Sequence, residues 1–116
     1  LIPYAPAVRV ADAPLHFLSG LGPLATGAAG EIPDDIQLQT RMTMDRLAAE
    51  LAALGLGWRN VVKIIEQVID IREIDEIGAA LAERYGTSWT PAVTLTEVDA
   101  LPHEGARVQL DVILAG

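Results

Sequence analysis

The stretch from residue 36 to residue 54 constrains the fold most, because mainly apolar side chains recur there every three or four positions. The recurring positions are Ile36, Thr40, Met44, Leu47, Leu51 and Leu54. An α-helix has about 3.6 residues per turn, so this spacing places them on one helical face. Acidic Asp34 and Asp35 precede the pattern, where a helix N-terminus favours negative charge, and Gly55 or Gly57 can end it. The pattern predicts a long helix with one buried face.

A run of β-branched residues follows at residues 61–70. Such side chains pack well on a pleated sheet, so we predict a central strand there. Glu66 inside this run would be costly if it were both buried and charged. It therefore faces a solvated interface, pairs with a base such as Arg107, or carries a raised pKa, and we expect one of the first two arrangements.

Weaker patterns predict the remaining elements. Residues 74–85 carry apolar side chains at helical spacing before Gly86, and residues 92–98 and 107–114 fit two strands. Two short apolar runs, residues 8–10 and 15–19, flank a turn-like segment and predict an opening hairpin. This order is typical of an α+β fold with a mostly antiparallel sheet and both helices on one face. The other face would be bare, and we expect partner subunits to pack there.

The last strand alternates between two kinds of side chain. Val108, Leu110 and Val112 are apolar, whereas Gln109 and Asp111 between them are polar. Successive strand residues point to opposite faces, so the two sets lie on opposite sides of the sheet. We expect the apolar set to pack on the helices and the polar set to face away from them.

Composition and charge exclude several classes of function. The chain has no cysteine and no metal-like spacing of histidines, so we expect neither a metal nor another cofactor. Its net charge of −8 would repel a polyanion, which argues against nucleic acid as a partner. We find no membrane-length apolar run and no signal sequence, and expect a cytoplasmic protein without a membrane partner. A hydrophobic fraction of 51% exceeds what a small monomer needs and favours an oligomer.

Motifs along nearly the whole chain resemble those of the Rid/YjgF family, the reactive-intermediate imine deaminases also called the L-PSP endoribonuclease family. These motifs are Pro3-Tyr4, Pro6-Ala7-Val8-Arg9, Phe17-Leu18-Ser19-Gly20, Gly30-Glu31-Ile32, the segment DIQLQTR at residues 35–41, Val61-Val62-Lys63, Asp70, Tyr85-Gly86, Pro91-Ala92 and Leu101-Pro102. The resemblance implies one domain over residues 1–116 with the fold of the Bacillus-type chorismate mutases. It also implies a homotrimer with a central barrel and three clefts at subunit interfaces.

The chain departs from this family at positions that the resemblance assigns to deamination. The family's deaminases hold the substrate carboxylate with an Arg directly after Pro-Ala, where this chain has Val93. An aliphatic side chain cannot replace a bidentate guanidinium. The family's Glu on the last strand, which positions water, aligns with Gln109, and an amide cannot take a proton from water. Three further cleft positions are altered, and they are Leu21, Gly78 and Leu95.

The resemblance also supplies the candidate site residues. The positions expected to bind a ligand are Tyr4, Ser19, Gly20, Val93, Thr94 and Gln109. No catalytic residue is assigned, and the candidates are Gln109, Glu66 and Asp111. Arg107 or Arg9 is a possible substitute for the missing anchor.

These features support hypotheses of different classes. We favour a trimeric protein whose intersubunit clefts bind a neutral or cationic small metabolite, without the usual 2-imino acid deaminase activity. The alternative is an active hydrolase or deaminase that takes a different imine or enamine. An endoribonuclease is disfavoured by the acidic charge and the few aromatic residues.

Overall fold

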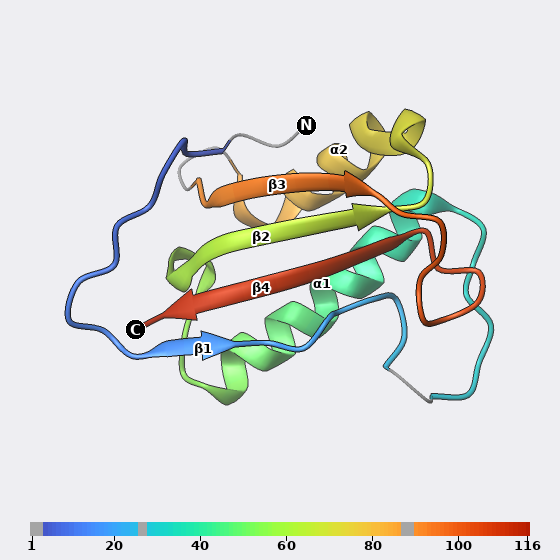
Figure 1. Cartoon of the computed structure of the whole chain (residues 1–116). Helices are drawn as coiled ribbons and strands as arrows, with labels where there is room; N and C mark the ends of the chain where they lie inside the picture. The colour runs from blue at the N-terminus through green and yellow to red at the C-terminus, as the bar shows by residue number, and fades with distance from the viewer. Residues whose placement is uncertain (1–3, 26–27, 87–89) are drawn as a thin grey trace.

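A computed structural model describes residues 4–25, 28–86 and 90–116, and shows two helices packed on one face of a four-stranded sheet (Figure 1). The strands are β1 (Leu15–Phe17), β2 (Val61–Val68), β3 (Ala92–Glu97) and β4 (Val108–Ala115), in the order β1-β4-β2-β3. The helices are α1 (Ile36–Ala53) and α2 (Ile74–Tyr85), with short 3₁₀ turns at Trp58–Asn60 and Ile71–Glu73. Strand β4 is antiparallel to β1 and β2, and β2 is parallel to β3. The predicted α+β class and the helices on one face are confirmed.

Helix α1 has the boundaries that its sequence pattern predicts. The Asp35 side chain caps the first turn by accepting hydrogen bonds from the backbone N–H groups of Gln37 and Leu38. Gly55 follows the helix with a positive φ of 69°, a conformation that suits glycine. The buried residues are Ile36, Gln39, Thr40, Thr43, Met44, Leu47 and Leu51. Leu54, predicted on this face, is exposed because the helix has already ended.

The predicted opening hairpin is wrong. Only residues 15–17 form a strand, and residues 8–10 form no strand at all. Strand β1 instead pairs with β4, and the chain stays beside β4 through a hydrogen bond from Leu21 N to Leu110 O of 2.8 Å. The reason is burial: β4 is backed by the core, whereas Val8 and Val10 are exposed and offer a partner strand no buried support.

The predicted alternation of β4 is confirmed. Val108, Leu110 and Val112 are at most 1% exposed and face the helices, whereas Gln109 and Asp111 are partly exposed on the other face. The core beneath the helices contains Met44, Leu47, Leu51, Ile64, Val68, Ile77, Leu81 and the buried residues of β4. No helix among the described residues is long and apolar enough to span a membrane.

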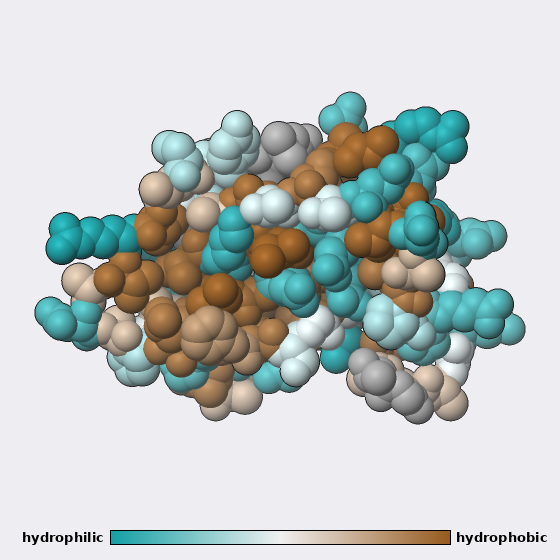
Figure 2. Space-filling model, viewed as in Figure 1, coloured by the Kyte–Doolittle hydropathy of each residue, from teal (hydrophilic) through white to brown (hydrophobic). Residues whose placement is uncertain are grey.

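The face of the sheet turned away from the helices is uncovered. Figure 2 shows apolar side chains gathered over this face, mainly toward the end where the chain finishes. Leu15 and Phe17 of β1 belong to this surface, and Phe17 is 71% exposed. We call this surface the open face.

A buried amide joins the start of α1 to the segment before β4. Gln39 is fully buried, and its Nε2 donates to Pro33 O at 2.8 Å and to Gly105 O at 3.0 Å. Its Oε1 accepts from Arg107 N at 2.9 Å. The Arg107 guanidinium in turn pairs with Glu73 at 2.9 Å. One side chain thus satisfies three backbone groups in segments far apart in the sequence.

Replacing this amide should destabilise the fold. Gln39→Leu leaves three backbone groups without their partner, and we expect it to lower the free energy of unfolding by about 2–4 kcal/mol. Gln37→Leu, two residues away on the same helix and half-buried, is the matched control and should change it by about 0.5 kcal/mol or less. Urea denaturation measures both, and equal effects would show that the Gln39 hydrogen bonds contribute nothing.

Candidate functional site

The predicted site residues fall into two groups toward opposite edges of the open face of the sheet. Ser19, Gly20, Gln109 and Asp111 lie along β4 and the chain beside it, whereas Thr94 lies on β3 at the other edge. Neighbouring strands are about 4.8 Å apart, so two to three spacings separate the groups by about 10–14 Å. Within one chain the members of each group lie together, but the two groups lie too far apart to contact the same small ligand.

The first group is packed around a glycine. A Cβ atom at Gly20 would lie 2.6 Å from Gln109 Nε2 and 3.3 Å from Asp111 Oδ1. Gln109 Nε2 donates to Gln67 Oε1 at 2.9 Å, and these residues pair across β4 and β2. The absence of a side chain at Gly20 therefore lets Gln109 hold this position. Gln67 was not predicted as a site residue, and the register of β2 on β4 is what reveals its contact with Gln109.

A small pocket adjoins this group. It is lined by Gly20, Gly22, Leu24, Pro102, His103, Ala106 and Gln109, and its volume is about 40 Å³. Sites for small molecules usually enclose about 300–1,000 Å³, so this pocket alone holds only a few waters. His103 is half-buried and lines the pocket. A wider open groove is lined by Asp34, Ile69 and residues 99–107, and Arg107 is the one residue of the sequence-based candidates that it contains.

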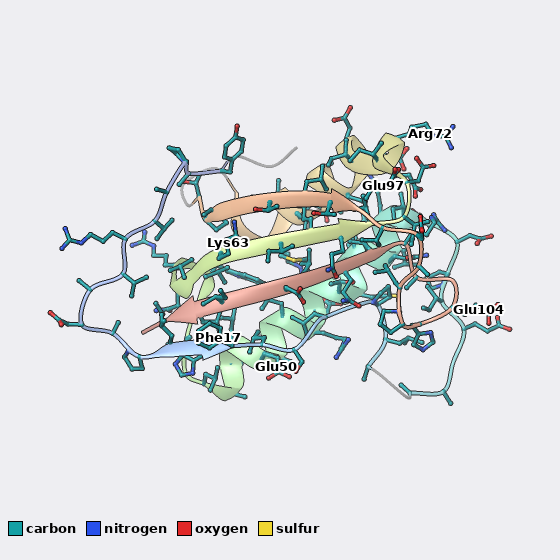
Figure 3. The ribbon with its side chains drawn as sticks, viewed as in Figure 1. Phe17, Glu50, Lys63, Arg72, Glu97 and Glu104 are labelled. Atoms are coloured by element: carbon teal, nitrogen blue, oxygen red, sulfur yellow. The ribbon has the colours of Figure 1, made fainter. Side chains whose placement is uncertain are left out.

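The second group lies at the start of β3. A hydrogen bond of 2.9 Å from Ala5 N to Pro91 O holds the N-terminal segment beside this strand, next to the half-exposed Tyr4. Lys63 Nζ donates to Thr94 Oγ1 at 2.7 Å across β2 and β3. Lys63 comes from the beginning of β2 (Figure 3). In the sequence Lys63 stands out only as part of the motif Val61-Val62-Lys63, and the β2–β3 register is what reveals its contact with Thr94.

Among the described residues, the two candidate substitutes for the anchor, Arg107 and Arg9, both lie outside β3, the strand that carries residue 93. Val93 itself is half-buried and packs against the core together with Leu95. The Glu73 carboxylate binds Arg107 and raises its pKa, and the guanidinium also donates to Asp34 O. Arg107 is thus already paired with an anion, and Arg9 lies in the exposed segment before β1. Of the other altered positions, Leu21 is 3% exposed in the core and Gly78 is buried in α2.

Glu66 lies on the opposite face from Gln109. Its side chain is 1% exposed among the residues of β2 that face the helices, and its Oε1 has no hydrogen-bond partner. Burial raises the pKa of this carboxyl to about 7. The expectation of a solvated or paired Glu66 is therefore wrong, because Arg107 binds Glu73 and the helices exclude water. Of the two candidate acids, only Asp111 shares a face with Gln109.

Metal ligands do not gather anywhere in the part of the chain that the structure describes. His16 Nε2 lies 3.1 Å from Gly116 O at the end of β4, away from His103 and its pocket. The groups that remain for chemistry on the open face are amides, hydroxyls, the Asp111 carboxylate and the Lys63 ammonium. Such groups orient a small polar molecule by hydrogen bonds.

Comparison with known proteins identifies close similarity over nearly the whole chain. The family model described as Endoribonuclease L-PSP matches residues 1–115. Protein DfrA of Myxococcus xanthus is 33% identical over 111 residues, which cover 96% of this chain and 83% of that relative.

Solved structures share the fold as well. A Rid family protein of Yersinia pestis, YyfA, aligns with a TM-score of 0.80 and 26% identity over 88% of this chain and 80% of its own. TdcF of E. coli, solved with bound serine, aligns with a TM-score of 0.78 over 99% of this chain and 93% of its own. Its 23% identity supports likeness of fold alone.

Adding a methyl group at residue 20 should displace Gln109. In Gly20→Ala the new Cβ would clash with the Gln109 amide, so we expect the Gln67–Gln109 hydrogen bond to break at a cost of about 1 kcal/mol. Side-chain amide resonances in NMR spectra would report the change. Gly22→Ala is the matched control, because its Cβ would meet no described atom closer than 3.8 Å. Unchanged amide resonances in Gly20→Ala would contradict the packing described here.

Proposed function

Because this chain belongs to the Endoribonuclease L-PSP (Rid/YjgF) family, we propose that it forms a homotrimer whose subunit interfaces bind a small neutral or cationic metabolite. The observation that carries this proposal is the division of the candidate site between two edges of one sheet face. A second copy that places its β3 edge beside the β1 edge of the first would bring Tyr4 and Thr94 close to Gly20 and Gln109. The 40 Å³ pocket would then gain the walls that a single chain lacks.

The open face supports such an assembly. Phe17 and Leu15 expose large apolar surfaces there, and burial of apolar area is the main driving force for stable association. Four polar side chains on this face already share hydrogen bonds, as Gln67–Gln109 and Lys63–Thr94, which lowers the cost of burying them.

The ligand class follows from the groups at the site. Gln109, Gln67 and Ser19 offer neutral donors and acceptors, and Asp111 adds a negative charge on the same face as Gln109. Val93 offers no charge to a carboxylate, and the net charge of −8 repels anions. TdcF, which shares the fold, is known with bound serine, so this scaffold accommodates a small polar metabolite. The apolar Val93, the Asp111 carboxylate and the acidic net charge favour a neutral or cationic ligand over a 2-imino acid.

A hydrolase acting on another imine or enamine is the second candidate. It is favoured by one observation, namely that Asp111 Oδ1 and Gln109 Nε2 both lie against Gly20. In this arrangement Gln109 orients a water molecule and Asp111 accepts its proton. An RNA substrate is disfavoured by the acidic charge, despite the name of the family.

Assembly is the first test. Light scattering of the purified chain should give about three times the chain mass of 12.3 kDa. Phe17→Glu places a charge on the open face and should yield monomers at micromolar concentration, because burying an unpaired charge is costly. Leu38→Glu is the control, since Leu38 is exposed on α1 at the other side of the molecule, and it should stay trimeric. A monodisperse wild-type monomer would remove the basis for an interface site.

Chemistry is the second test. The wild-type protein should show no measurable hydrolysis of 2-iminobutyrate in an amino-acid-oxidase-coupled assay. Loss of a charged, partly desolvated anchor costs about a thousandfold or more in kcat/KM. Val93→Arg alone should not restore activity, whereas Val93→Arg with Gln109→Glu is the smallest change expected to do so.

Wild-type turnover equal to that of an Arg-bearing relative would overturn the assignment of ligand class. Circular dichroism of each variant separates a folding failure from a chemical one, because Val93 packs against the core.

A further inference from the structure

Glu66 is the only charged residue in the buried set of the described chain. Its side chain is 1% exposed, and the other buried polar residues are Gln39, Thr40 and Thr43, all neutral. Those three use their side chains in hydrogen bonds to the backbone. Glu66 Oε1 has none. A buried oxygen without a partner is rare in folded proteins and marks a position that the fold tolerates at a cost.

Among the described residues, the neighbours of Glu66 on the sheet and on the two helices carry no positive charge. Along β2 its neighbours on the same face are Ile64 and Val68, and across the sheet it faces Leu95 on β3 and Leu110 on β4. The core residues that α1 and α2 contribute above this face include Met44, Leu47, Ile77 and Leu81, none of which titrates. Among the described residues, no base faces Glu66 from any of these elements.

We propose that Glu66 is a proton-binding residue that makes the packing of the helices on the sheet depend on pH near neutrality. The carboxyl is neutral in the packed core, and its ionisation places an unpaired charge beneath α1 and α2. The packing then weakens as pH rises. This inference does not rest on the proposed function, because Glu66 lies on the face opposite to the candidate site.

The direction of the effect follows from proton linkage. Burial raises the pKa of Glu66 from 4.5 to about 7, so the folded chain holds a proton that the unfolded chain releases. Stability from this group is fully present below about pH 4.5 and is lost as pH rises to about 7. The pKa values of Asp70 and Glu83 are lowered by Arg72 and Arg41, and both carboxylates stay ionised above pH 5.5. The ionisation of Asp70 and Glu83 therefore does not change how the free energy of unfolding varies with pH near neutrality.

The experiment compares the unfolding equilibrium at pH 5.5 and pH 8.5, at one protein concentration, for the wild type and Glu66→Gln. A pKa of about 7 predicts that the wild-type unfolding constant rises about 30-fold more than that of Glu66→Gln over this interval. Glu66→Met, an apolar side chain of similar length, gives a second test if the buried amide prevents folding. Glu50→Gln is the matched control, because Glu50 is exposed on α1 (Figure 3), and it should keep the wild-type slope.

A direct readout separates protonation from a merely structural role. The side-chain carboxyl carbon of Glu66 should titrate near pH 7 in NMR spectra of the folded wild-type protein. The signal should be absent in both Glu66 variants and present in Glu50→Gln. A Glu66 resonance that titrates below pH 5, or equal pH slopes for the wild type and Glu66→Gln, would overturn the proposal. If the unfolding equilibrium depends on pH as predicted but the protein forms no trimers or binds no ligand, the proposed function is contradicted and the inference about Glu66 is not.

Discussion

The fold depends on the buried side-chain amide of Gln39. Its three hydrogen-bond partners are backbone groups that lie outside the helices and strands. Gln39 is the one side chain of α1 that reaches both the loop before the helix and the segment that leads into β4. Because it accepts from the backbone of Arg107, it fixes where β4 begins, and the two-residue alternation then decides which side chains face the helices. A shift of one residue would place Gln109 in the core and Leu110 on the open face. The geometry of the candidate site thus depends on an amide outside it.

The sheet has one covered face and one uncovered face, and this asymmetry separates stability from recognition. Neighbouring residues of β2 show the separation most clearly, since Glu66 points beneath the helices while Gln67 joins Gln109 on the open face. A substitution at residue 66 changes the core, whereas a substitution at residue 67 changes the candidate site. The same holds on β3, where Val93 packs against the core and Thr94 binds Lys63.

The extent of single helices and strands and the side chains that they bury were predictable from the sequence. The contacts between elements were not. The periodicity of α1 and the alternation of β4 predict both elements and their faces, because each pattern is read within one element. The failure at residues 8–10 has a long-range cause, since β1 pairs with a strand about a hundred residues later. The Lys63–Thr94 and Gln67–Gln109 contacts likewise need the strand order. Glu66 was misjudged because its face depends on register, while β-branched residues fill both faces of β2.

The resemblance predicts an arginine at the position where this chain has Val93, and an apolar residue at this position has a structural consequence. Val93 and Leu95 both contact the core, so the apolar residue contributes burial that a guanidinium could supply only with its methylene stem. An arginine at residue 93 would have to turn its charged head out of the core, past the edge of β3, toward a ligand or a neighbouring subunit. On the proposed assembly, Val93 adds no charge to an edge that the interface would bury, and the Lys63 ammonium beside Thr94 is the cation that this edge already holds. An apolar residue at position 93 would thus favour closure of the proposed interface.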